Sequence, residues 1–185
     1  MNNGYNVVCK ALSLSPSNTF KWTEEYAVFA QPNFTSGTPV TPTTKIMPIQ
    51  SGQVTVLDSD GVFLTPTGNP WDGPFEINNA SVPMCFGVIC MTGDGLLPIS
   101  LDFQPMGTGL EPFTPMLNLM VWFGRGLGTA VMFSTPVTRA LEVVYTGTTS
   151  QSVSYAFDPT TGSGIWVDNS KMGAGLQYIQ AILSY

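Results

Sequence analysis

Turn-forming residues interrupt this chain roughly every 8 to 12 residues, and this spacing leaves no room for long helices. The 185 residues include 19 Gly and 15 Pro, which together with Asn, Asp and Thr separate short apolar or alternating segments. Strands of that length, divided by such turns, are typical of β-sandwiches and barrels. The sequence therefore predicts an all-β fold. Residues 1–185 are expected to form a single antiparallel β-sandwich, or a jelly-roll or barrel-like domain, with long loops rich in Pro, Thr and Gly and little helix.

Each predicted strand is an apolar or alternating run bounded by turn-forming residues. Alternation is clearest where Val153, Tyr155 and Phe157 face one side of the strand. Pro and Gly in Asp158–Gly162 then predict a turn, which joins this strand to the one around Trp166 in a hairpin. In chain order the predicted runs are Tyr5–Leu14, Lys45–Gln50, Gln53–Leu57, Gly61–Leu64, Phe75–Ile77, Val82–Met91, Leu96–Phe103, Leu117–Phe123, Thr129–Phe133, Ala140–Thr146, Ser152–Phe157, Gly164–Asp168 and Leu176–Leu183.

Two segments have a less regular pattern. Pro83–Met91 is apolar on both faces, which predicts a central strand that is covered on both sides. Thr23–Glu25 has the capping and charge pattern of a helix that would run through Ala30, and the same stretch also fits a strand. We further expect one core to contain side chains from the later strands, namely Trp122, Phe123, Val143, Tyr155, Phe157 and Trp166.

Charged side chains are scarce, at 10% of the residues against about 25% in a typical soluble domain. The six Lys and Arg are scattered singly, whereas a nucleic-acid-binding surface needs clustered cations. We therefore expect no direct contact with nucleic acid. With so few charged side chains, there is little electrostatic repulsion between the apolar surfaces of neighbouring copies. The composition therefore favours self-association as a dimer or a larger assembly.

The sequence shows neither a signal peptide nor a membrane-spanning segment. Residues 1–4 lack the basic and apolar regions of a signal peptide, and the apolar stretch Val82–Met91 has about half the length needed to cross a bilayer. Cys85 and Cys90 stand too far apart in an extended strand for a disulfide between them. Pairing of Cys9 with either one stays open, and three buried free thiols in a reducing compartment are the favoured interpretation.

The chain contains no histidine, which removes the commonest general base near neutral pH and the catalytic triads and zinc sites that depend on it. The sequence therefore predicts no enzyme, no cofactor and no metal site. Asp58–Gly61 resembles the start of a calcium loop but lacks the later ligands, so we interpret it as an acidic turn and leave ion binding by Asp58 and Asp60 open. Gly124–Gly128 has the glycines of a phosphate-binding loop without its Lys and helix, which favours a hairpin connection.

One loop combines residues suited to ligand contact. Asn69, Trp71 and Asp72 bring an amide, an indole ring and a carboxylate together within a short stretch, and such groups stack on a sugar and hydrogen-bond its hydroxyls. Asp72 and Glu76 are also the nearest candidates for the pair of carboxylates that glycosidases use. The alternative is a rigid, Pro-bounded turn whose Trp71 plugs an edge of the core. We expect no hydrolysis that depends on the two carboxylates.

From residue 117 onward the predicted segments follow a recognisable order. An apolar strand at residues 117–123 is followed by a Gly-rich connection, a strand at 140–145, the hairpin around 158–162 and a final strand at 178–183. This succession, which covers about a third of the chain, resembles the C-terminal part of protruding domains of small icosahedral RNA viruses such as caliciviruses. The resemblance implies an outward-facing β domain on the virion surface, assembled in the host cytoplasm, that dimerises and touches a host receptor through its loops.

Two functional hypotheses follow. The first is a viral structural protein, an outward-facing capsid or spike domain whose partners are its own copies, other capsid subunits and a host glycan or receptor. The second is a non-catalytic carbohydrate-binding or lectin-like module, or a phage decoration or adhesin module. Neither hypothesis requires a cofactor, a metal, nucleic acid or membrane insertion. They differ in oligomeric state, because only the second is compatible with a stable monomer.

Overall fold

The computed structural model describes residues 7–13, 18–71, 73–92, 95–102, 104–114, 118–122, 127–133, 140–144, 153–158, 160 and 163–168. These residues form eleven β-strands and no helix, which confirms the all-β class. No helix long and apolar enough to span a membrane occurs in this part of the chain. Contacts divide the chain into two compact units: unit 1 comprises Met1–Ser13, Asn18–Pro115 and Gly126–Thr135, and unit 2 comprises Leu14–Ser17, Met116–Arg125 and Pro136–Tyr185. That residues 1–185 form one domain stays a prediction.

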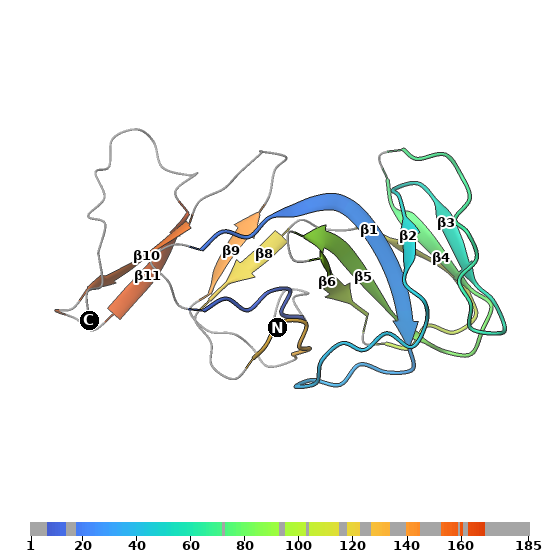
Figure 1. Ribbon diagram of the computed structural model, residues 1–185, viewed down its shortest axis with the longest axis horizontal. Helices are drawn as coiled ribbons and strands as arrows, with labels where there is room; N and C mark the ends of the chain where they lie inside the picture. The colour runs from blue at the N-terminus through green and yellow to red at the C-terminus, as the bar shows by residue number, and fades with distance from the viewer. Residues whose placement is uncertain are drawn as a thin grey trace. The chain divides into compact units, whose positions relative to one another are not determined.

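Unit 1 is built from two β-sheets (Figure 1). The first sheet has the strand order β2-β1-β5-β6 and is antiparallel throughout. The second has the order β3-β4-β7, in which β4 and β7 are antiparallel but β3 and β4 run parallel. A parallel pair needs a crossover, so residues 58–74 return the chain to the end at which β3 began. The strands are β1 Trp22–Gln31, β2 Met47–Ile49, β3 Val54–Leu57, β4 Phe75–Asn79, β5 Cys85–Thr92, β6 Gly95–Leu101 and β7 Gly109–Phe113.

The two sheets of unit 1 pack face to face around an apolar core. Phe75 and Phe113 stack with their ring centroids 5.9 Å apart, and Phe86 meets Phe113 edge-on at 6.4 Å. Alternation decides which side chains enter, because in β4 Phe75 and Ile77 are fully buried while the residue between them is only partly buried. These strands therefore form a β-sandwich. Its core also contains Val28, Ala30, Ile49, Leu57, Phe63, Met84 and Val88.

The first sheet is covered on its other face as well. Residues 130–132 lie between residues 7–8 and 37–40 and hydrogen-bond to both. The N–H of Val8 donates to the carbonyl of Val131 over 2.9 Å, and the N–H of Met132 donates to the carbonyl of Thr38 over 2.9 Å. β5 is consequently buried along almost its whole length, which confirms the central strand predicted from its two apolar faces. The second apolar cluster consists of Ala27, Phe29, Phe34, Cys85, Ile89, Leu101 and Met132.

The stretch from Thr23 through Ala30, for which the sequence allowed a helix or a strand, belongs to strand β1. It pairs with β2 along one edge and with β5 along the other. Ala27 and Phe29 enter one apolar cluster, while Val28 and Ala30 enter the other. A strand sends successive side chains to opposite faces, and a helix does not. The helix signal at Thr23–Glu25 is therefore overridden by burial on both faces of the sheet.

A buried asparagine ties together the loops at one end of the second sheet. The side chain of Asn79 is 1% exposed. Its Nδ2 donates to the carbonyls of Val82, Met106 and Gly107 over 3.1, 3.0 and 3.2 Å, and its Oδ1 accepts from the N–H of Ser81 over 3.0 Å. These bonds satisfy a polar group that is out of reach of solvent, and they fix two loops, the β4–β5 and β6–β7 connections, to the end of β4.

Unit 2 contains two antiparallel pairs of strands (Figure 1). In one pair, β8 Asn118–Val121 lies beside β9 Leu141–Val144. In the other, β10 Val153–Asp158 lies beside β11 Ser163–Asp168, and Tyr155 stands opposite Trp166. The predicted antiparallel pairing of these two strands is thereby confirmed, while Pro159, Thr161 and Gly162 of the predicted turn lie outside the described residues.

The expectation that side chains of the later strands share one core can be compared with the structure for only some of its residues. Val143 is buried, and Trp122 and Tyr155 are half-buried. The structure does not describe Phe123 or the predicted final strand Leu176–Leu183. It also does not describe the side chains of Phe157 and Trp166.

We expect Phe86→Ala to lower the free energy of unfolding by about 3–5 kcal/mol, because it removes a ring that contacts both sheets and leaves a cavity between them. Phe86 is 1% exposed, whereas Leu110 is 56% exposed on β7 and provides the control. Leu110→Ala should change stability by less than about 0.5 kcal/mol. Chemical denaturation of both variants measures the difference, and equal effects of the two substitutions would contradict the sandwich core.

Candidate ligand-contact site around Trp71

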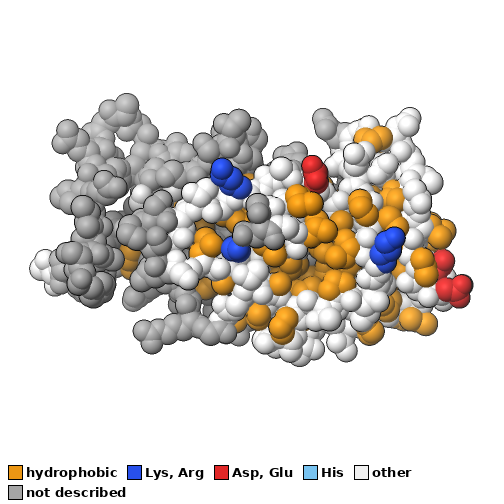
Figure 2. Space-filling view, in the orientation of Figure 1, with side chains coloured by type: hydrophobic (Ala, Val, Ile, Leu, Met, Phe, Trp, Pro, Cys, Tyr) orange, Lys and Arg blue, Asp and Glu red, His pale blue; other side chains and the backbone are white. Residues whose placement is uncertain are grey.

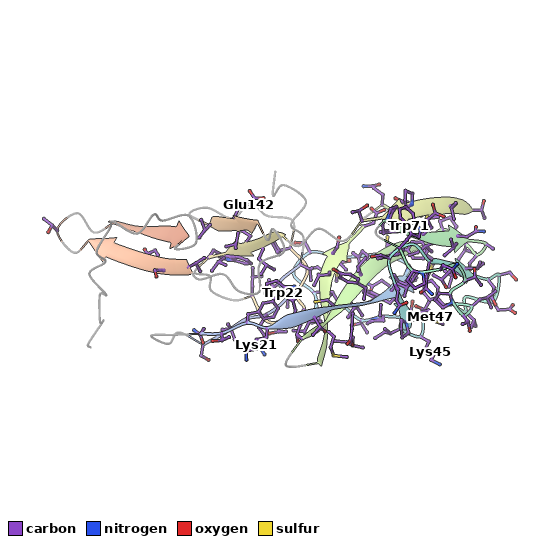
Figure 3. All side chains as sticks on the ribbon, turned by 90° about the horizontal axis from the view of Figure 1, so that it is seen from above. Lys21, Trp22, Lys45, Met47, Trp71 and Glu142 are labelled. Atoms are coloured by element: carbon purple, nitrogen blue, oxygen red, sulfur yellow. The ribbon has the colours of Figure 1, made fainter. Side chains whose placement is uncertain are left out.

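Trp71 lies on the surface of unit 1, in the loop that leads into β4 (Figure 3). It is 60% exposed, and no other aromatic residue is exposed among those whose side chains the structure describes. The five-membered part of the indole lies on Gly52 and the six-membered part lies on Gly73. Both contacts are so close that a Cβ at either glycine would overlap the ring. The ring is therefore supported by backbone and still presents a large apolar surface to solvent.

Backbone hydrogen bonds fix the two segments that meet under the ring. The N–H of Trp71 donates to the carbonyl of Ser51 over 3.1 Å, and the N–H of Gly52 donates to the carbonyl of Pro74 over 3.1 Å. Gly52 has a φ of +79°, a left-handed conformation that glycine adopts without strain. Gly68 approaches the carbonyl of Gly52 so closely that a Cβ there would lie 3.3 Å from the oxygen. Small residues thus allow the loops to close beneath the indole.

This placement excludes the alternative in which Trp71 plugs an edge of the core, since a plug would be buried. Asn69 lies exposed in the same loop, two residues before the indole. Asp72 lies outside the described residues, and Glu76 is half-buried in β4. Of the three predicted contact residues, the structure therefore places Asn69 and Trp71 together on the surface.

The acidic turn at Asp58–Gly61 lies at the other end of β3. One carboxylate oxygen, Asp58 Oδ1, accepts from the N–H of Asp60 over 3.0 Å and from the N–H of Val62 over 2.9 Å. Gly61 supplies the positive φ of +76° that closes the turn. These bonds give Asp58 a structural role. Among the described residues, no group of three or more Cys, Asp or Glu side chains is placed to hold a metal ion.

The sequence reasoning missed a second pair of carboxylates, Asp102 and Glu111. Glu111 stands opposite the buried Ile77 in the pairing of β4 with β7. Burial raises the pKa of Glu111, and the carboxylate of Asp102 raises it further. Nothing in the local sequence indicates that the pKa of Glu111 is raised, because it is the pairing of β7 with β4 that brings Glu111 to the inner side of the sheet. Asp102 Oδ1 accepts from the N–H of Gln104 over 2.9 Å.

The three cysteines are free thiols. Cys85 and Cys90 are buried as expected, whereas Cys9 is only half-buried. The thiols of Cys9 and Cys90 hydrogen-bond to each other, and this bond, together with burial, raises the pKa of Cys9. The same bond lowers the pKa of Cys90. Burial raises the pKa of Cys85.

No protein-family model matches this sequence, and neither the curated proteins nor the solved structures contain a match to it. The function of the chain is therefore argued from its own residues. The surface around Trp71 is the feature that combines exposure with local rigidity, which is the usual combination in a binding loop on a β scaffold.

We expect Glu111→Gln to raise the melting temperature at neutral pH. The raised pKa of Glu111 means that the folded state disfavours the charged carboxylate. The protonated carboxyl group therefore favours the folded state at low pH, and this stability is lost as the pH rises through the folded-state pKa. The gain should shrink as the pH falls below about 4, where Glu is protonated in both states. Thermal melts between acidic and neutral pH test this, with the exposed Glu25→Gln on β1 as control. A gain that is independent of pH would contradict the electrostatic cause.

Proposed function

We propose that this chain is a non-catalytic recognition domain of a self-associating surface assembly, such as the outward-facing capsid or spike domain of a virus. In this role unit 1 provides the scaffold and the loop of Trp71 contacts a host glycan or receptor. The protein would act at the virion surface after assembly in the host cytoplasm.

The observation that carries the recognition role is the exposure of Trp71 on a glycine support. Leaving an indole in solvent forgoes the stabilisation that its burial would give, roughly 1.5–3 kcal/mol for a large apolar side chain. The same ring has little freedom to move, because Gly52 and Gly73 contact it from the backbone. A rigid aromatic side chain loses little conformational entropy on binding, which is why Tyr and Trp dominate binding surfaces.

Two features support self-association. Figure 2 shows hydrophobic side chains gathered on one face of unit 1, with few charged groups among them. In the described part of the chain, β7 has no strand beyond it at the edge of the second sheet, and such an edge is a ready template for a second copy. Interfaces between permanent partners are poor in charge and rich in apolar side chains, as this surface is. The exposed large hydrophobic residues are Leu12, Val62, Leu64, Trp71, Val82, Leu96 and Leu110.

The second candidate is a stand-alone carbohydrate-binding or adhesin module. The exposed indole supports this function equally well, because it requires no contact with another subunit. The two candidates differ only in whether the surface assembles, so the oligomeric state distinguishes them.

We expect the protein to bind members of a broad glycan array through Trp71. Trp71→Ala should abolish the signals, because it removes the apolar surface on which a ligand rests. Gly107→Ala is the matched control, since a Cβ at that position meets no atom within 4 Å. Array signals of equal strength for the wild type and for Trp71→Ala would refute a recognition role for this loop.

We expect the protein to form a dimer or a larger assembly at micromolar concentration, because its few charges leave apolar surfaces free to associate. Light scattering and sedimentation across a concentration series measure the mass. Leu110→Arg, which places a charge on the open edge strand β7, should shift the population toward monomer. A wild-type mass that stays at 19.9 kDa would instead identify the stand-alone module.

A further inference from the structure

We infer that the surface of Trp71 binds an uncharged pyranose ring, and that it discriminates against sialylated, sulfated and other anionic sugars. The inference rests on the proposed recognition role of Trp71 and specifies the chemical class of the ligand. It follows from the shape of the site and from the distribution of charge around it.

The shape of the site fits one sugar ring. A pyranose presents C–H bonds on one face, and the electron-rich face of an aromatic ring attracts their partial positive charge. The indole of Trp71 offers such a face on an open surface, with Gly52 and Gly73 supporting it. Because Trp71 is the one exposed aromatic residue among the described side chains, the contact is a single stacking platform and not an enclosed cage.

The described polar side chains beside the platform include two neutral amides. Asn69 is exposed in the same loop, and Gln50 is exposed in the neighbouring segment that passes beneath the ring. The N–H of Gln50 donates to Gln53 Oε1 over 2.9 Å, which holds the Gln53 side chain against this segment. Carboxamides donate and accept hydrogen bonds, so they match sugar hydroxyls, which do the same.

The charge distribution disfavours an anionic ligand. Between Lys45 and Arg125 the sequence contains no Lys or Arg, and the same stretch holds seven Asp and Glu. Figure 3 shows Lys45 on the opposite side of unit 1 from Trp71. Proteins bind carboxylate and sulfate through charge-assisted hydrogen bonds, chiefly from Arg and Lys. Residues 46–124 therefore offer no Lys or Arg to pair with a sialic acid carboxylate at Trp71.

A cationic ligand is the competing possibility, because an indole face also attracts quaternary ammonium groups. Strong recognition of that kind uses several aromatic rings that enclose the cation. Trp71 stands without a second exposed ring among the described side chains, and its amide neighbours suit hydroxyls better than methyl groups. The neutral sugar is therefore the better match.

The test compares neutral, anionic and cationic ligands. Wild-type protein is titrated with pairs of neutral and sialylated oligosaccharides that share the same core, and with choline, using calorimetry and ligand-observed NMR. Three variants are measured alongside. Trp71→Ala removes the platform, Gly73→Ala keeps the indole but displaces it by placing a methyl group beneath the ring, and Gly107→Ala is the control in open space.

We expect the neutral member of each pair to bind more tightly than its sialylated partner. Trp71→Ala and Gly73→Ala should each weaken that binding by about tenfold or more, the loss expected when one stacking contact is removed. Gly107→Ala should bind as the wild type does. Thermal melts of all variants show whether Gly73→Ala is folded, and if it is not, Trp71→Phe replaces it and should retain part of the affinity.

Two results would overturn the inference while leaving the recognition role intact. One is Trp71-dependent binding that is tighter for the sialylated partner, and the other is Trp71-dependent binding of choline without binding of neutral sugars. The proposed recognition role fails separately, if no ligand on the array or in the titrations distinguishes wild type from Trp71→Ala.

Discussion

The fold of unit 1 depends on the burial of β5 on both of its faces. One face packs against the second sheet, and the other is covered by residues 7–8, 34–46 and 130–132. Both edges of β5 are paired, with β1 and β6, so its backbone polar groups are satisfied away from water. A strand that is apolar on both sides has no exposed arrangement of low free energy, and the rest of the unit is assembled around it.

The position of Trp71 follows from that arrangement. Phe86 on β5 contacts Phe113 on β7, and this contact joins the second sheet to the first. The parallel pairing of β3 with β4 then brings the residues before both strands to the same end of the second sheet. Gly52 precedes β3 and Trp71 and Gly73 precede β4, so the sheet itself places the indole on its glycine support. An exposed side chain thereby acquires the rigidity of the scaffold beneath it.

Several features were predictable from the sequence because they depend on local patterns. The all-β class, the hairpin of β10 and β11 and the central strand β5 follow from periodicity and turn residues. The parallel pairing of β3 with β4 was not predictable, since it depends on where a long crossover returns. The same holds for Glu111, whose raised pKa comes from its pairing partner and from Asp102, which is distant in the sequence. The sequence does not decide between strand and helix at residues 22–31, because the capping pattern there is a genuine local signal for a helix.

The sequence by itself determined that Asn69 and Trp71 form a loop with residues suited to ligand contact, because residue type and turn propensity are local properties. It also determined the lack of cations between Lys45 and Arg125, since that is a matter of composition alone. Only the tertiary structure decided that Trp71 is exposed and not a plug in the core. The physical reason is that part of the support for the ring comes from Gly52, which is distant from Trp71 in the sequence. The pairing of β3 with β4 brings the two residues together, so packing decides which side of the indole meets solvent.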